Sequence, residues 1–217
     1  MKKVAIIVAG GKGVRMNADI PKQFLILKEK PILIHTIEKF CDFDDVILVL
    51  PKNTINIWED ICVKYNMNIN HSIVIGGNTR FHSVKNGLEL VDNNSIVAIH
   101  DGVRPFISDN LTQKLLSIVK KGIGAVPGIP VKESIRKIGD GETSTQVDRS
   151  NLYKVQTPQC FLSSEIKDSY SKNYSERFTD DASVFESNSG KITMILGEEK
   201  NVKITTKEDL RMTAALM

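Results

Sequence analysis

The chain has 217 residues with ordinary shares of hydrophobic (41%) and charged (25%) side chains, which is typical of a globular protein of one domain. Its formal net charge of +3 comes from 29 basic and 26 acidic residues, and this balance argues against a nucleic-acid partner. No stretch has the ~20 consecutive apolar residues of a membrane span, so no membrane partner is expected either.

Strand-like and helix-like segments alternate along most of the chain. Continuous apolar runs predict strands that are covered on both faces, and apolar stripes at helical spacing predict helices. The expected strands are 4–9, 46–50, 72–75, 96–99, 124–129 and 192–196. The expected helices include 32–40, 55–65, 80–91 and 111–121. The alternation predicts an α/β fold, a Rossmann-like three-layer sandwich with a mainly parallel sheet, in which ligands bind beyond the carboxyl ends of the strands.

The segment 132–155 interrupts this alternation. It is polar, and two short alternating stretches flank Gly139-Asp140-Gly141, which predicts a β-hairpin. A polar hairpin outside the core is either a lid or a dimerisation arm. We therefore expect one domain, 1–217, from which an arm (132–155) protrudes.

The N-terminus and the cysteines indicate the compartment. The apolar run that opens the chain is too short for a signal peptide and ends in glycines. The three cysteines are widely spaced and odd in number, which fits a reducing compartment and argues against a disulfide framework or a zinc site. A cytoplasmic protein is expected.

A glycine-rich loop, 9–16, follows the first strand. Its glycines allow backbone N–H groups to approach phosphate oxygens, and Arg15 and Lys22 add positive charge. The loop lacks the closing residues of a P-loop and the third glycine of a dinucleotide fingerprint. A tight turn explains the glycines alone equally well, but the cations favour a triphosphate whose α-phosphorus is attacked.

Two further motifs also follow expected strands. His100-Asp101-Gly102 comes after the fourth strand, where an aspartate can hold Mg²⁺ while phosphates supply other ligands, although a turn cap is the simpler alternative. We interpret His100 itself as structural. Gly76-Gly77 precedes a helix and can offer backbone groups to a base edge, whereas a helix capped by Asn78 or Thr79 is the alternative.

Taken in chain order, these motifs resemble those of the 2-C-methyl-D-erythritol 4-phosphate cytidylyltransferase family. The resemblance rests on 9–16, 21–23, 76–84, 100–105, 147–149, 157–159, 179–183 and 203–205. It implies transfer of CMP from CTP to a polyol phosphate with Mg²⁺ as cofactor and without a covalent enzyme intermediate. It also implies a homodimer held by the arm.

The resemblance assigns roles to individual residues. Arg15 and Lys22 would stabilise the transition state at the α-phosphate of CTP, and Asp101 would hold Mg²⁺. Arg149 and Lys203 would grip the phosphate of methylerythritol phosphate, with Arg149 acting across the dimer interface. The implied substrate-binding residues are Ala9, Gly10, Gly11, Gly13, Gly77, Asn78, Arg80, Ser83, Arg104, Ser134, Thr157 and Thr179.

Three alternatives remain at this point. Ribitol-5-phosphate cytidylyltransferases share the loop, the lysine and the aspartate, but 76–88 and Val147-Asp148-Arg149 look more like the methylerythritol enzymes. The same fold also permits a non-catalytic nucleotide-binding protein. The joint presence of the charged candidates argues against this alternative; they are Arg15, Lys22, Asp101, Arg149 and Lys203. An NAD-dependent oxidoreductase is disfavoured by Arg15 in the glycine loop and by Leu50-Pro51, where the second strand ends without an acidic residue.

Overall fold

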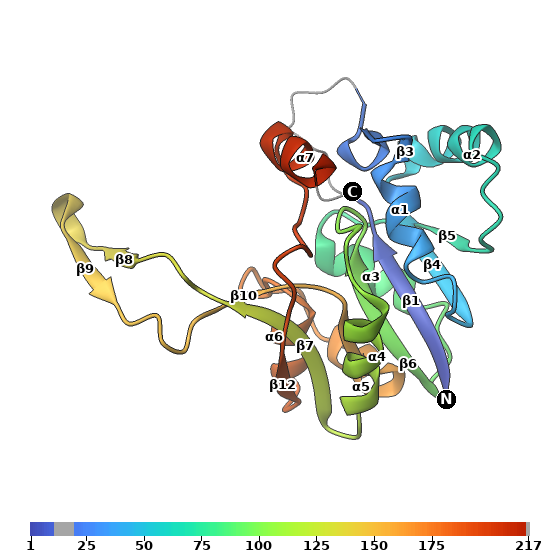
Figure 1. Ribbon diagram of the computed structural model, residues 1–217. Helices are drawn as coiled ribbons and strands as arrows, with labels where there is room; N and C mark the ends of the chain where they lie inside the picture. Colours follow the sequence, from blue (N-terminus) through green and yellow to red (C-terminus); the bar gives the residue numbers. More distant parts are fainter. Residues whose placement is uncertain (11–19, 216–217) are drawn as a thin grey trace.

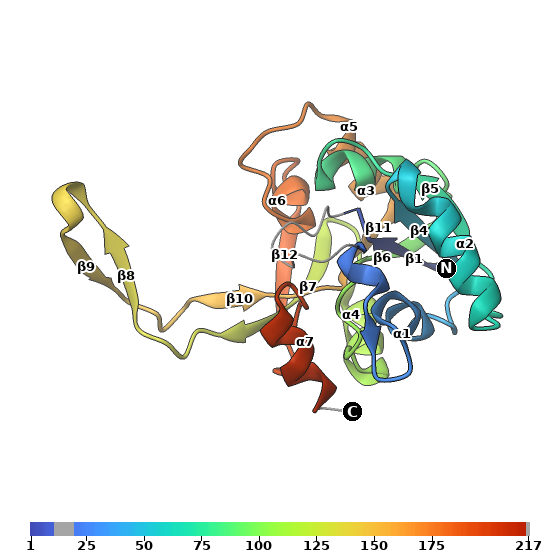
Figure 2. The same cartoon turned by 90° about the horizontal axis from the view of Figure 1, so that it is seen from above.

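The computed structural model describes residues 1–10 and 20–215. Figures 1 and 2 show a body in which helices flank a central sheet, with a hairpin projecting from it. The strands are β1 (Lys2–Val8), β2 (Ile26–Leu27), β3 (Lys30–Pro31), β4 (Asp45–Leu50), β5 (Ser72–Ile75), β6 (Ser95–Asp101), β7 (Ile123–Pro130), β8 (Ile135–Ile138), β9 (Ser144–Val147), β10 (Tyr153–Val155), β11 (Gln159–Leu162) and β12 (Lys191–Leu196). The helices are α1 (Ile32–Glu38), α2 (Ile55–Lys64), α3 (Arg80–Leu88), α4 (Asp109–Ile118), α5 (Ser163–Ser171), α6 (Asp181–Glu186) and α7 (Lys207–Ala214), with short 3-10 turns η2 (Lys22–Phe24), η3 (Lys52–Thr54) and η4 (Asp140–Glu142).

The main sheet has eight strands within the described residues. Its centre, in the order β6-β1-β4-β5, is parallel throughout. Beyond β6, strands β11 and β10 run antiparallel to β7, while the late strand β12 runs parallel to it. The expected α/β sandwich with a mainly parallel sheet is thus confirmed, and β10 and β11 are its antiparallel members.

Two hydrophobic clusters cover the two faces of this sheet. Along β1, Ala5 and Ile7 belong to the cluster with α1, α2 and α4, whereas Val4 and Ile6 belong to the cluster with α3, α5 and α6. Successive strand side chains point to opposite faces, so a strand buried on both faces must be apolar at nearly every position. This explains why the central strands appear in the sequence as continuous apolar runs.

The arm (132–155) contains the expected hairpin. Strands β8 and β9 pair antiparallel from Ile135 opposite Val147, and Gly141 in the connecting turn has a φ of +64°, which favours glycine. Both strands lie away from the body in Figures 1 and 2. The last residues of the range form β10, which pairs with Gly128–Pro130 of the main sheet and anchors the arm at its root.

Helix bounds differ from the sequence expectation mainly at carboxyl ends. The helix expected at 80–91 ends at Leu88, because the N–H groups of Glu89 and Leu90 bond three residues back in a turn. Trp58 of α2 is fully buried in the core. The strand expected at 192–196 is present as β12, and the chain then runs without regular structure to α7.

Candidate functional site

The candidate site lies where β1 and β6 end side by side. Val8 pairs with Asp101 in the parallel register, and the N–H of Gly102 donates to the carbonyl of Val8 at 2.9 Å. A Cβ on Gly102 would lie 2.9 Å from that of Ala9, so this close approach of the two turns requires glycine. Ala9, where the glycine loop begins, and the aspartate therefore share one edge, as expected from the parallel topology.

Three cations surround the carboxylate of Asp101. Its Oδ2 lies 3.1 Å from Nε of Arg104 and 3.0 Å from Nζ of Lys203, and its Oδ1 lies 3.6 Å from Nε of Arg80. Burial alone would raise the pKa of Asp101, but the three cations hold it well below its usual value. The group is therefore a carboxylate at any physiological pH, embedded in positive charge.

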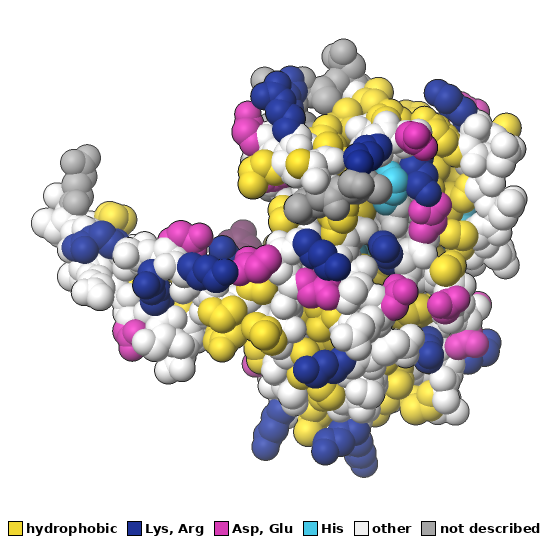
Figure 3. Space-filling view, in the orientation of Figure 1, with side chains coloured by type: hydrophobic (Ala, Val, Ile, Leu, Met, Phe, Trp, Pro, Cys, Tyr) yellow, Lys and Arg dark blue, Asp and Glu magenta, His cyan; other side chains and the backbone are white. Residues whose placement is uncertain are grey.

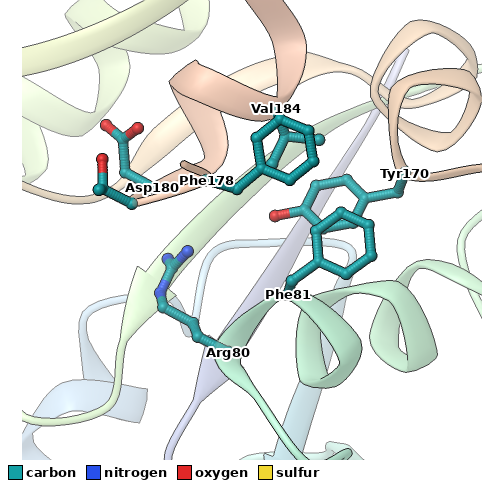
Figure 4. Close-up of a pocket in the computed structure, with 7 residues that line it drawn as sticks. Arg80, Phe81, Tyr170, Phe178, Asp180 and Val184 are labelled. Atoms are coloured by element: carbon teal, nitrogen blue, oxygen red, sulfur yellow. The ribbon is translucent and has the colours of Figure 1, made fainter. Parts of the chain in front are cut away.

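Arg80 connects this cluster to a second buried acid. Its Nη1 and Nη2 donate to the two oxygens of Asp181 at 2.8 and 2.6 Å, and the hydroxyl of Tyr170 donates to Asp181 at 2.6 Å. Although burial opposes the charge, the two aspartates raise the pKa of Arg80 above its usual value. Burial and Asp181 likewise raise the pKa of Tyr170. Figure 4 shows Arg80 at one end of a small pocket walled by aromatic rings, and Thr179 also lines this pocket.

Glycines and a serine form the neighbouring wall. Thr79 caps α3 through its hydroxyl, which accepts from the N–H of His82, and this outcome agrees with the capping alternative. One turn later, Ser83 accepts a hydrogen bond from the N–H of Gly77 at 3.1 Å. A Cβ at Gly76 would lie 3.0 Å from Oγ of Ser83, and one at Gly10 would lie 3.5 Å away. The two glycine turns therefore converge on one hydroxyl.

Thr157 faces inward rather than toward a solvent-filled pocket. Its hydroxyl accepts from the N–H of Asp101 at 3.1 Å and lies 3.1 Å from Nδ1 of His100. Nε2 of His100 lies 3.0 Å from the carbonyl of Arg104, and since a carbonyl only accepts, Nε2 carries the proton and Nδ1 accepts from Thr157. Burial lowers the pKa of His100 to about 4. His100 is thus a neutral structural residue that supports the turn after β6.

The structure brings most of the predicted site residues together, but not all. Ala9, Gly10, Gly77, Asn78, Arg80, Ser83, Asp101, Arg104, Thr157 and Lys203 come from turns at the carboxyl edge of the sheet and from the two segments packed against it. Lys22 begins η2, and its neighbour Gln23 donates from Nε2 to the carbonyl of Ala9 at 2.9 Å. Gly11, Gly13 and Arg15 lie outside the described residues.

Ser134 and Arg149 belong to the arm. The guanidinium of Arg149 donates to the carbonyl of Lys132 across the base of the hairpin. Because β8 and β9 project from the body in both views, the arm does not fold back over the site of its own chain.

Sequence reasoning missed three residues of this region. Asp181 follows Asp180, which caps α6, and the carboxylate of Asp181 instead accepts from Arg80. Asn201 and Gln156 are buried polar residues that hold the segment leading to Lys203. No local pattern marks them, because their partners lie far away in the sequence.

The described residues contain no cluster of three or more histidine, cysteine, aspartate or glutamate side chains that would by itself hold a metal ion. Among the same residues, no helix is both long and apolar enough to cross a bilayer.

Comparison with known proteins gives a consistent result. A family profile for 2-C-methyl-D-erythritol 4-phosphate cytidylyltransferase matches residues 3–217. The enzyme of that name from Azobacteroides pseudotrichonymphae is 48% identical over 222 residues, covering 100% of this chain and 99% of the relative, and that of Bacteroides fragilis is 43% identical with both chains fully covered. A 4-diphosphocytidyl-2C-methyl-D-erythritol synthase structure from Anaerococcus prevotii superposes with a TM-score of 0.82 at 31% identity, covering 99% of this chain and 95% of its own. The Francisella tularensis cytidylyltransferase gives a TM-score of 0.82 at 28% identity, with both chains fully covered.

Proposed function

This chain belongs to the 2-C-methyl-D-erythritol 4-phosphate cytidylyltransferase family, and on that premise we propose how its residues divide the work of the reaction. It is a nucleotidyltransferase that transfers CMP from CTP to methylerythritol phosphate in the methylerythritol phosphate pathway. The names of its relatives favour this activity over ribitol-5-phosphate transfer or non-catalytic nucleotide binding.

The chemistry requires two anions to approach each other. An oxygen of the substrate phosphate forms a bond to the α-phosphorus of CTP, and the bond from that phosphorus to the β-phosphate oxygen breaks, so that pyrophosphate leaves. The substrate phosphate is already nucleophilic at neutral pH, and catalysis then comes from positioning and from neutralising repulsion. The observation that carries our proposal is the convergence of Arg80, Arg104 and Lys203 on Asp101 beside the glycine turns.

Within this cluster we assign Lys203 to the substrate phosphate. Its side chain is 39% exposed, more than the side chains of Arg80 (28%) and Arg104 (11%), so its ammonium is the cation best able to leave Asp101 for an incoming anion. Arg80 and Arg104 remain bound to buried partners and maintain the positive field. Lys22, together with Arg15 outside the described residues, is assigned to the α-phosphate of CTP.

The backbone around Ser83 is assigned to the cytidine. The hydroxyl of Ser83 accepts from the N–H of Gly77, and Gly10 approaches the same hydroxyl from the turn after β1, so the two glycine turns meet at one wall. Asn78 is exposed at the rim of this wall. Thr179 beside Arg80 and the turn carrying Thr157 complete the set assigned to the polyol phosphate.

Mg²⁺ is proposed as cofactor, with Asp101 as its protein ligand. The residues fit this ion, because magnesium in proteins is commonly held by one or two carboxylates while phosphates and waters fill the remaining positions. Oδ1 of Asp101 has the more distant of the cationic contacts and is the oxygen we assign to the ion. When bound, Mg²⁺ would neutralise charge on the triphosphate.

We further propose a cytoplasmic homodimer in which the arm of one subunit reaches the site of the other. Ser134 and Arg149 are assigned to the site but project away from their own body. Large apolar side chains are exposed where the arm leaves the body, as Figure 3 shows; they are Tyr153, Val155, Met194 and Leu196. A second subunit would cover them. No nucleic-acid or membrane partner is proposed.

The assignments are tested by pyrophosphate release from CTP with Mg²⁺, using methylerythritol phosphate and ribitol 5-phosphate separately. We expect turnover with the first substrate. Lys203→Ala should raise the KM for methylerythritol phosphate more than the KM for CTP, whereas Asp101→Asn should reduce kcat and weaken the dependence on Mg²⁺. Light scattering at micromolar concentration should give the mass of a dimer, and a monomer that is fully active would refute the role of the arm.

A further inference from the structure

The segment that carries Lys203 has no regular secondary structure, yet its backbone is held at several points. The N–H of Gly197 donates to the carbonyl of Gly128 at 2.8 Å, and the N–H of Ile204 donates to the carbonyl of Val103 at 3.0 Å. Ile204 is fully buried. These two contacts fix the ends of the stretch 197–204, and the contacts between them must set where the ammonium of Lys203 lies.

Two buried amide side chains hold the middle of this stretch. Gln156 accepts from the N–H of Glu198 at 3.1 Å and donates to its carbonyl at 2.8 Å. Asn201 is fully buried, and its Nδ2 donates to the carbonyl of Thr157 at 2.9 Å. The side-chain hydroxyl of the same threonine accepts from the N–H of Asp101. One side-chain bond therefore ties the lysine-bearing segment to the residue that supports the carboxylate.

The backbone carbonyl of Asn201 adds a second link. It accepts from Nη1 of Arg104 at 2.8 Å, and the same guanidinium donates from Nε to Oδ2 of Asp101 at 3.1 Å. Lys203 reaches that same oxygen. The position of Asn201 thus fixes both cations relative to Asp101. Arg104 is held by its hydrogen bond to the carbonyl of Asn201, and Lys203 follows Asn201 by two residues along the backbone.

The two polar atoms of the Asn201 amide differ in their surroundings. Oδ1 is buried and has no hydrogen-bond partner among the described residues. A buried acceptor without a partner is unfavourable, so an amide used only to fill space would be a poor choice here. The contribution of the Asn201 side chain is therefore the hydrogen bond that its Nδ2 donates to the carbonyl of Thr157.

We propose that Asn201 is a positioning residue of this enzyme, which places Lys203 for the substrate phosphate through its hydrogen bond to Thr157. The inference rests on the role given above to Lys203. Misplacing a binding group by about 1 Å can reduce a rate about a hundredfold, so Asn201→Ala is expected to lower kcat/KM for methylerythritol phosphate by about tenfold or more. The KM for CTP should change less than about twofold, because Lys203 is not assigned to CTP.

The experiment is a double-mutant cycle with Lys203→Ala, followed by steady-state kinetics with both substrates. If Asn201 acts through Lys203, adding Asn201→Ala to the lysine variant should cost little further activity, because coupled residues are not additive. An equal loss in both backgrounds would overturn the proposal. If Lys203→Ala alone has no effect, the role of the lysine fails first, and the inference fails with it.

Two further variants separate positioning from stability. Asn201→Asp has the same size but lacks the donor, and it should show the same selective loss if the alanine variant folds poorly. Ser163→Ala is the matched control, because it removes a buried hydrogen bond to the N–H of Ser95 at the opposite end of β6 from Asp101. This control should keep the kinetic constants of the parent enzyme. Equal kinetic losses in Ser163→Ala and Asn201→Ala would show that only stability is affected, and would refute positioning.

Discussion

Replacing Asp181 with asparagine tests the buried ion pair beside the site. The carboxylate is fully buried and accepts from both terminal nitrogens of Arg80 and from the hydroxyl of Tyr170. Asparagine keeps the shape, but it removes the negative charge and turns one acceptor into a donor. The guanidinium of Arg80 then remains at a partly buried position without its main partner.

The expected loss follows from this burial. Removing one partner of a buried ion pair costs about 3–5 kcal/mol, because the other charge remains uncompensated. The side chain of Arg80 is 28% exposed, so water relieves part of this cost and the lower end, about 3 kcal/mol, applies. A chain of this size loses roughly 2–4 °C in Tm per kcal/mol, so Asp181→Asn should lower Tm by roughly 6–12 °C.

Calorimetry or thermal melting followed by circular dichroism measures this change, and two further variants test its cause. Tyr170→Phe removes one hydrogen bond to the carboxylate and should cost about 1.5 kcal/mol, less than the loss of the charge itself. Arg80→Met combined with Asp181→Leu removes both charges, so it should recover much of the stability that the single variant loses. If the double variant is as unstable as the sum of its single changes, the loss does not come from an unpaired charge, and the reasoning is refuted.

Three other predictions follow from burial. The pKa of His100 is lowered to about 4 from an ordinary value of about 6.5, so between these values the unfolded chain binds this proton and the folded chain does not. Acidification from about pH 7 to about pH 4 should therefore reduce the free energy of unfolding, and by about 3 kcal/mol more than in His100→Gln. Urea titrations of both proteins at each pH would measure this difference. Cys41 is exposed, whereas Cys160 is fully buried and burial raises its pKa, so a thiol reagent should modify Cys41 first, and early labelling of Cys160 in the native protein would contradict its burial. A Cβ on Gly87 would lie 2.9 Å from Cγ2 of Ile6, so Gly87→Ala should destabilise the protein by about 1–2 kcal/mol, although alanine favours helices. A variant that is more stable than the parent would show that Ile6 and the helix can shift apart at little cost.

Much of the fold and part of the site could be predicted from the sequence, because both follow from patterns among residues that are close together in the chain. Apolar runs and helical stripes located the central strands and their helices, and the parallel topology then placed the turns after β1 and β6 at one edge. The approach of Ala9 to Gly102 follows from this topology. The arm was recognisable because its polar alternation and its glycine turn break the pattern of the body.

The remaining contacts could not be predicted, because they join residues that are distant in the sequence and give no local signal. Arg80 and Asp181 are 101 positions apart, and each of them alone looks like an ordinary charge at a helix start. Thr157 looked like a pocket residue, yet its hydroxyl is used by His100 and Asp101. Asn201 shows no pattern at all, since its importance comes from burial.

The place of β12 in the chain has a consequence for biosynthesis. Among the strands of the described residues, β12 is made last; it enters the sheet beside β7, and Lys203 follows it. On the ribosome, the sheet from β1 to β6 can assemble around Asp101 while the lysine is still untranslated or inside the exit tunnel. The growing chain therefore acquires the cation that we assign to the substrate phosphate later than the strands that position Asp101, and a nascent protein whose synthesis stops before β12 lacks both that strand of the main sheet and Lys203.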